Sequence, residues 1–267
     1  MLLKKNFRQV EEWRRDAVEH AAYGRAREAL GLFLNRGDLH ILPTKTEVLD
    51  RIVERWIVLG GAKNPETVLC VANLNADLRV INRKCQAVRI EAGEVNPSKT
   101  IFANQELFHV GDKLQFTKLD RKKGIQNSNT GKITGIDEKQ GRLTVRLDKD
   151  GREVTVTTQE FGDHIRLAYG STTFKAQGKT TEHAIILLGG PMTDRHSVYV
   201  QASRAKFKTE LFVDSDRAGP ELRDIVKVAS LDRTKNLAHD VAETNRMRHE
   251  QEELQQRQRQ RGISLGL

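Results

Sequence analysis

The chain has 267 residues, of which 30% are charged and only 5% aromatic, and its formal net charge is +9. This length suffices for one large or two modest domains with a buried core. The basic balance favours a polyanionic partner, although many basic proteins bind no nucleic acid. No apolar run reaches membrane-spanning length, and the segment Met1–Asn6 is too short in its apolar part for a signal peptide. We therefore expect a soluble, cytoplasmic protein.

Metal and nucleophile chemistry find little support in the residue pattern. Cys70 and Cys85 are the only cysteines, without metal-ligand spacing or a paired framework, which fits a reducing compartment. The eight histidines show no metal spacing, and no Ser/His/Asp or Cys/His arrangement stands out. The sequence predicts no metal site.

The first hundred residues alternate between helical and strand patterns, which predicts a parallel sheet covered by helices. Thr44 and Glu47 form a capping box before the clearest amphipathic helix, which ends at Gly60-Gly61. The expected elements are a helix, or two separated near Gly24, over 7–34, strands over 38–42 and 66–72, and a helix capped by Asn75 that extends to about 90.

Residues 110–160 change to a period of two. Leu114 and Phe116, and later Leu143, Val145 and Leu147, alternate with polar neighbours, which predicts a small antiparallel barrel or meander. The parallel pattern is expected to resume at Ile165, so an insertion within one α/β domain is more economical than two domains in tandem.

The last third is expected to contain a buried strand at 184–188, a helix at 193–205 capped by Thr193 and a strand at 209–213. The predicted fold is a RecA-like parallel sheet with an inserted small antiparallel β-barrel and a helical C-terminal tail. Four parts are predicted. Residues 1–105 and 163–216 are the two parts of the RecA-like lobe, and residues 106–162 are the inserted SH3-like barrel. Residues 217–267 are a helical, polar tail, whose end is a solvated helix or disordered.

Two stretches, Tyr169–Thr180 and Tyr199–Lys206, each lie where an apolar run passes into a polar helix start. In an open α/β sheet this is the usual position of ligands. Gly178-Lys179-Thr180 resembles the end of a P-loop, but the glycine required five positions earlier is replaced by Thr173. The chain therefore has no nucleotide-phosphate loop of its own.

Hydroxyl, amide and exposed main-chain groups in the first stretch could hold a phosphate, at Thr172, Lys175, Gln177 and Gly178. The same residues equally suit an ordinary helix cap. Arg204 and Arg8 offer permanently charged guanidinium groups that can follow the charge of a phosphoryl transfer. The alternative is that both are surface arginines with carboxylate partners.

A cationic, amide-rich arm is expected between the barrel strands. Lys122, Lys123, Asn127 and Asn129 suit contact with the backbone of single-stranded nucleic acid. They equally suit a solvated hairpin.

Four stretches, in order, resemble the carboxyl-terminal motor lobe of superfamily 1 DNA helicases of the RecD-like kind, and are most similar to the helicase part of MobF-type (TraA/TraI-like) conjugative relaxase-helicases. Asn6-Phe-Arg-Gln9 is similar to helicase motif IV, and Val110–Phe116 together with Gly141–Leu147 is similar to the barrel inserted in this lobe. Thr172–Thr180 is similar to motif V, and Tyr199–Ala205 is similar to motif VI.

The resemblance implies roles for these residues. Arg8 and Arg204 would touch the γ-phosphate of ATP, near Gln177 and Gly178, while Thr172 and Gln177 would couple the nucleotide to single-stranded DNA guided by the barrel. Phe174 replaces the family's usual histidine and Gln201 its usual small residue, so coupling or rate would differ.

The family's P-loop lobe, with its Mg²⁺-binding acid, and its relaxase domain have no counterpart in these residues. The resemblance thus implies that ATP with Mg²⁺ binds only when a P-loop lobe, in cis or trans, completes the motor, and that the chain alone is inactive as an ATPase. A non-catalytic single-stranded DNA-binding or partner-docking module and a decayed remnant are the alternatives.

Overall fold

The computed structural model describes residues 9–233. Its larger sheet has five parallel strands in the order β1-β12-β11-β2-β10. The strands are β1 (Leu39–Leu42), β2 (Val68–Ala72), β10 (Gly170–Thr172), β11 (Thr181–Leu187) and β12 (Ala205–Asp214).

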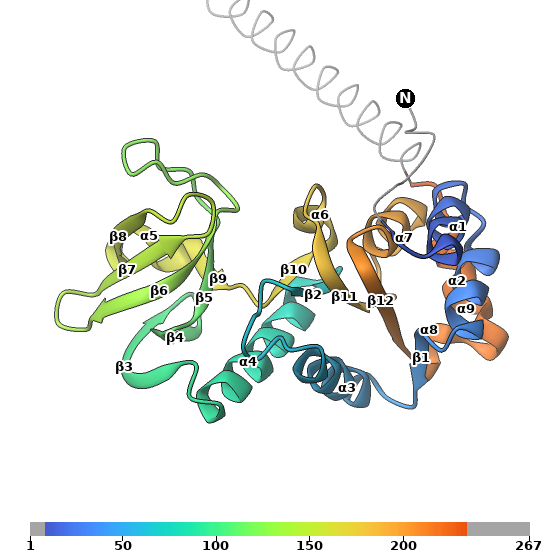
Figure 1. Cartoon of the computed structure of the whole chain (residues 1–267), viewed down its shortest axis with the longest axis horizontal. Helices are drawn as coiled ribbons and strands as arrows, with labels where there is room; N and C mark the ends of the chain where they lie inside the picture. The colour runs from blue at the N-terminus through green and yellow to red at the C-terminus, as the bar shows by residue number, and fades with distance from the viewer. Residues whose placement is uncertain (1–8, 234–267) are drawn as a thin grey trace, which may run out of the picture. The chain divides into compact units, whose positions relative to one another are not determined.

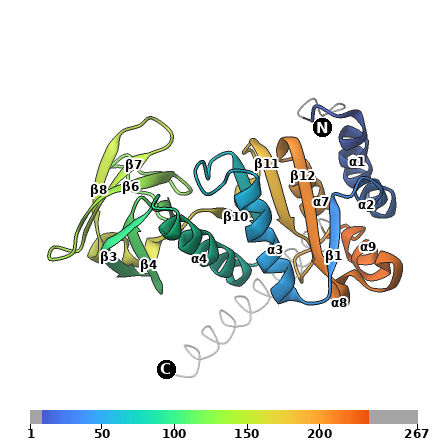
Figure 2. The same ribbon diagram turned by 60° about the horizontal axis from the view of Figure 1, so that its bottom comes forward.

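Both faces of this sheet are covered by helices, as Figures 1 and 2 show. Ile185 and Leu187 of β11 belong to the core beneath α3 and α4, whereas Ile186 and Leu188 belong to the core on the other face. Successive side chains of a strand point to opposite faces, so a strand buried on both faces has no polar alternation. The helices are α1 (Glu12–Ala22), α2 (Ala26–Asn35), α3 (Lys45–Val58), α4 (Asn75–Glu91), α7 (Arg195–Ala202) and α9 (Arg223–Ala229).

Local signals set several helix ends as predicted. Gly24, at φ +75°, separates α1 from α2, and the Thr44 side chain accepts a hydrogen bond from the Glu47 main-chain N–H at the start of α3. Two cap predictions are wrong. Leu74, not Asn75, is the N-cap of α4, and Asp194, not Thr193, caps α7.

Both predicted caps have long-range hydrogen-bond partners instead. The Asn75 side chain accepts a hydrogen bond from Arg166, and the Thr193 hydroxyl accepts one from Asn73. Tertiary contacts therefore override the local capping preference at these two positions.

An antiparallel sheet of five strands, in the order β8-β7-β6-β5-β9, lies between β2 and β10 in the sequence. The predicted alternation is present, because Leu143, Val145 and Leu147 are buried while Arg142 and Arg146 are exposed. This inserted sheet comprises β5 (Lys113–Phe116), β6 (Thr130–Asp137), β7 (Arg142–Leu147), β8 (Glu153–Thr157) and β9 (Ile165–Leu167), and a two-stranded ribbon, β3 (Asn96–Ala103) with β4 (Glu106–Val110), precedes it.

The parallel pattern does not resume at Ile165. β9 pairs antiparallel with β5, Gln115 lying opposite Arg166, and the parallel sheet resumes only at β10. A three-residue strand carries too short a pattern to reveal its sheet, which long-range pairing decides. The predicted α/β fold class with an antiparallel insertion is confirmed, and the domain boundaries and the SH3-like form remain proposals.

The remaining short helices of residues 9–233 are α5 (Thr158–Phe161), η1 (Gly162–His164), α6 (Thr173–Ala176), α8 (Ser215–Ala218) and η2 (Pro220–Leu222). The predicted tail is helical in α8, η2 and α9, and its residues beyond 233 lie outside the described range. Among the described helices, none has both the length and the apolar character needed to cross a bilayer.

A buried polar cluster joins the two sheets. The Tyr169 hydroxyl, between β9 and β10, donates to Asp112 Oδ1 at 2.6 Å, and Gln86 of α4 donates to Asp112 Oδ2 at 2.6 Å. Burial raises the pKa of the Asp112 carboxyl, although these hydrogen bonds oppose the shift. Trp56 of α3 packs edge-on against Tyr169, with ring centroids 5.9 Å apart. This cluster fixes where the inserted sheet meets α4.

Candidate functional site

Segment 172–179 lies at the centre of the candidate site. The Thr172 side chain caps α6 by accepting a hydrogen bond from the Lys175 main-chain N–H at 3.3 Å. Gln177 and Gly178 follow as exposed residues, and Gly178 has φ +85° with nothing within 4 Å of the position a Cβ would take. Open space therefore lies beside an exposed main-chain turn.

Arg204 anchors the far end of this segment. It is only 5% exposed, and its Nη1 donates to the carbonyl oxygens of Ala176, at 3.1 Å, and Lys179, at 3.3 Å. Its Nε donates to the Val200 carbonyl oxygen at 2.7 Å. Arg204 is therefore not a surface arginine, because it holds the main chain on both sides of Gln177 and Gly178.

The residues that follow Arg8 lie beside the start of β12, the strand that begins directly after Arg204. Gln9 Nε2 donates to the Ala205 carbonyl oxygen at 3.1 Å, and the Val10 N–H donates to the Lys206 carbonyl oxygen at 3.2 Å. Arg8 itself lies outside the described residues. The structure thus brings its immediate neighbour in the sequence next to Arg204.

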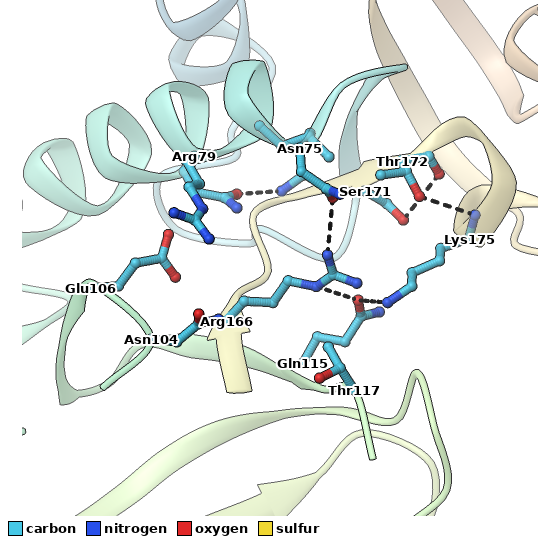
Figure 3. A pocket seen from close by; sticks show the side chains of 13 residues that line it. Asn75, Arg79, Asn104, Glu106, Gln115, Thr117, Arg166, Ser171, Thr172 and Lys175 are labelled. Carbon is cyan, nitrogen blue, oxygen red and sulfur yellow. Dashed lines mark hydrogen bonds between the residues drawn. The ribbon is translucent and has the colours of Figure 1, made fainter. Parts of the chain in front are cut away.

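A pocket of about 380 Å³ opens at the other end of the segment, between α4, β10 and the inserted sheet. Figure 3 shows its polar side chains converging from these elements. The polar and charged residues that line it include Asn75, Arg79, Asn104, Glu106, Gln115, Thr117, Arg166, Thr172 and Lys175. The predicted pair Thr172 and Lys175 therefore shares a pocket with residues from distant parts of the chain.

Gln115 and Arg166 join the inserted sheet to α4 and α6. Arg166 Nε donates to Gln115 Oε1 at 3.0 Å and its Nη1 to Asn75 Oδ1 at 3.1 Å. Lys175 Nζ donates to the same Gln115 oxygen at 3.4 Å. These contacts tie the inserted sheet to α4 and α6 across the pocket, as the dashed lines in Figure 3 show.

The charge of the pocket is mainly positive. Arg79, Arg166 and Lys175 face one carboxylate, Glu106. Burial raises the pKa of Glu106 and lowers the pKa of Arg166, since the pocket solvates ions poorly. A phosphate group would relieve this desolvated positive charge.

A buried polar network connects the start of segment 172–179 to α7 and to the end of β2. Thr173 Oγ1 donates to Asn73 Oδ1 at 2.6 Å, and Gln201 Nε2 donates to Thr173 Oγ1 at 2.8 Å. Gln201, which departs from the resembled pattern, thereby ties α7 to α6. Asn73 directly follows β2, so the carboxyl-end rule for parallel strands could have identified it.

The predicted cationic arm lies in the β5–β6 loop. Lys123 pairs with Glu160 at 2.6 Å, and Asn129 Oδ1 accepts a hydrogen bond from the Gln126 N–H, whereas Lys122 and Asn127 are exposed. Within the described part of the chain, none of these four arm residues lines the pocket. Their binding role remains a prediction.

Arg166, Gln115, Arg79 and Asn75 were not identified as site residues from the sequence. Arg166 reaches the pocket only because β9 pairs with β5, and the hydrogen bond between Arg166 and Gln115 spans 51 positions. No local pattern marks such a pair. Residues 9–233 contain no group of three or more His, Cys, Asp or Glu side chains suited to a metal ion.

The structure defines the class as an α/β fold, in which a parallel sheet covered by helices carries an antiparallel insertion. The chain is 26% identical over 210 residues to the conjugal transfer protein TraA of Rhizobium radiobacter, covering 77% of this chain and 18% of that protein. It is 29% identical over 139 residues to the multifunctional conjugation protein TraI of Escherichia coli K12, covering 50% of this chain and 7% of that protein.

The resemblance to TraA- and TraI-type proteins that the motifs indicated is thereby confirmed. The chain spans less than a fifth of the length of these relatives, so the similarity concerns one region of each. No protein-family model matches the chain.

Solved structures with similar folds are also found. A Pif1 helicase from Bacteroides in complex with ADP-AlF₃ and single-stranded DNA has 17% identity and a TM-score of 0.46, covering 76% of this chain and 50% of that chain. Pif1 helicase from Candida albicans has 13% identity and a TM-score of 0.39, covering 74% and 57%. The resemblance to conjugal transfer proteins therefore rests on the sequence relatives and not on these structures.

Proposed function

We propose that this chain is a motor-lobe region of an ATP-dependent DNA helicase or translocase that acts in conjugal transfer. The observation that carries the proposal is the double attachment of segment 172–179. Thr172 and Lys175 line a cationic pocket, and four residues later the same segment is held by Arg204. A displacement at one end is transmitted to the other through a single helical turn.

The end of segment 172–179 that Arg204 holds is suited to contact the triphosphate of ATP. The exposed Gly178 turn leaves room for a phosphate, and Arg204 and Arg8 would supply arginine fingers at the boundary with a second lobe. When bound, ATP supplies the free energy of γ-phosphate hydrolysis. Within these 267 residues no P-loop sequence occurs, so a P-loop lobe, in cis or trans, would hold the nucleotide and Mg²⁺.

The pocket end suits the backbone of single-stranded DNA. Three cations and several amide and hydroxyl groups gather there, which fits sequence-independent contact with phosphates. Thr172 and Gln177 would relay the state of the nucleotide to the strand.

Binding of single-stranded DNA to the pocket is tested with a fluorescent oligothymidylate of about six nucleotides. Arg166→Gln is expected to weaken binding about tenfold, and to lower the slope of log affinity against log salt by about 0.7 because one phosphate contact is lost. Lys139→Gln, at an exposed turn outside the pocket, is the charge-matched control. Equal binding by Arg166→Gln and the control would refute the proposed DNA pocket.

Catalytic dependence is tested by hydrolysis. The 267-residue chain alone should show no strand-stimulated ATPase activity above that of Arg204→Ala. Detectable activity that Arg204→Ala abolishes would contradict the need for a second lobe.

A non-catalytic DNA-binding module is the second candidate, favoured by the exposed Lys122 in the cationic arm and by the cations that line the pocket. For that function, neutralising Lys122 and Lys123 would abolish strand binding. Arg204→Ala would then affect no activity even when a P-loop lobe is present.

A further inference from the structure

A second basic pocket lies at the opposite end of α4 from the first. Its volume is about 420 Å³, and the cations that line it are Lys63, Arg89, Lys113 and Lys132, with Glu66 and Asp148 as the carboxylates. Arg89 is 3% exposed and donates to the carbonyl oxygens of Ala62 and Gly111, while its Nε is buried without a hydrogen-bond partner. None of these residues was singled out in the sequence.

The outer face of the inserted sheet adds a row of like charges. Lys113 of β5 lies opposite Lys132 of β6, and Lys132 lies opposite Arg146 of β7. Neighbouring strands are about 4.8 Å apart, and like charges placed directly opposite each other destabilise a sheet. Three adjacent cations therefore cost folding free energy unless an anion neutralises them.

The chain's own carboxylates neutralise only part of this row. Lys113 Nζ lies 3.2 Å from Asp148 and 3.6 Å from Glu66, and Arg146 pairs with Glu153 at 3.5 Å. Lys132, in the middle of the row, is exposed and has no ion-pair partner among residues 9–233. Lys132 therefore offers an external anion an uncompensated charge in the middle of the row.

The two pockets border the same face of β5. Lys113 lines the second pocket and Gln115 lines the first, and residues two apart on a strand share a face, about 7 Å from each other. Lys179, at the end of segment 172–179, lies within electrostatic range of Arg166 in the first pocket and of Lys113 in the second. Burial lowers the pKa of its ammonium group, and the nearby charges of Lys113 and Arg166 lower it further.

We propose that single-stranded DNA bound in the first pocket continues past Lys179 along the outer face of β5–β7 into the second pocket. Its phosphates would contact Lys113, Lys132 and Arg146. The inference rests on the proposed function, since the first pocket supplies the beginning of the path. It assigns to the inserted sheet a specific set of contacts, distinct from the predicted Lys122 and Lys123 arm.

The test compares two fluorescent oligothymidylates, of about six and about fifteen nucleotides, over a series of salt concentrations. Lys132→Gln is expected to weaken binding of the longer strand threefold to tenfold and to reduce its salt slope by about 0.7. Binding of the short strand should not change. Lys139→Gln is again the control, and thermal melts establish that both variants are folded.

The outcomes separate the two proposals. If the short strand binds in an Arg166-dependent manner but Lys132→Gln matches the control with the longer strand, the extended path is wrong and the first pocket stands. If the longer strand depends on Lys132 while Arg166→Gln has no effect on either strand, the first pocket is wrong, and with it the continuous path. If neither strand binds, both proposals are wrong.

Discussion

The parallel sheet and its junction with the inserted sheet hold their buried carboxylates in different ways. Glu210 of β12 is 2% exposed and lies between two cationic side chains, with Arg55 Nη2 at 3.0 Å and Lys208 Nζ at 3.4 Å, while the imidazole His40 Nε2 is 3.5 Å away. Asp112 at the junction is fully buried, and neutral donors, including Tyr169 and Gln86, are bound to it.

The two environments shift the pKa values in opposite directions. Burial raises the pKa of Glu210, but His40, Arg55 and Lys208 outweigh it and lower the pKa to about 2. At Asp112 burial prevails and the pKa is raised. Charged contacts thus stabilise the parallel sheet at neutral pH, whereas the ionised junction is held less firmly.

The largest effect is expected on ATP hydrolysis, from a change at Arg204 directly before β12 of the parallel sheet. In a protein that includes a P-loop lobe, Arg204→Ala should slow ATP hydrolysis by about a thousandfold or more, the scale of an arginine finger. The measurement is steady-state hydrolysis with saturating single-stranded DNA, with Arg27→Ala on the exposed face of α2 as the control. Retained hydrolysis in a folded Arg204→Ala protein would contradict the finger role.

The next effect tests the charged contacts around Glu210. Because its folded pKa is lowered from 4.5 to about 2, its contribution to stability, about 3 kcal/mol, is complete above pH 4.5 and disappears as the pH falls toward 2. Glu210→Gln should therefore lower the free energy of unfolding at neutral pH. The difference from the unmodified protein should shrink on acidification, as urea titrations can measure. A difference independent of pH would show that the ion pairs are not its source.

The smallest effect is expected at Asp112. A raised folded pKa means that ionisation costs stability at neutral pH, and that this cost is relieved as the pH falls through the folded pKa. Asp112→Asn keeps an acceptor oxygen for the Tyr169 hydroxyl, but its amide nitrogen cannot accept the hydrogen bond from Gln86. The lost hydrogen bond and the removed cost of ionisation act in opposite directions, so the free energy of unfolding at neutral pH should fall by only about 1 kcal/mol. The substitution should also remove the relief in mild acid. A loss as large as that of Glu210→Gln would erase the contrast between the two regions.

Local patterns explain why much of the fold could be predicted. The unbroken apolar run Ala184–Leu188 indicated a strand buried on both faces, and the alternation through Leu143, Val145 and Leu147 indicated a half-exposed sheet. Thr172 and Lys175 were predicted as site residues because ligands in such folds bind after the end of a strand. Their joint position in one pocket with Arg166 depends on strand pairing across 51 positions, which periodicity does not encode.

The sequence by itself determined the alternation of elements, the two motif stretches at helix starts and the absence of a P-loop within these residues, because each depends on neighbours in the chain. Only the tertiary structure decided that β9 joins the inserted sheet, that Arg204 holds the main chain on both sides of Gly178, and that Lys113, Lys132 and Arg146 form one row. These depend on contacts between distant segments, where packing and hydrogen-bond satisfaction override local preference.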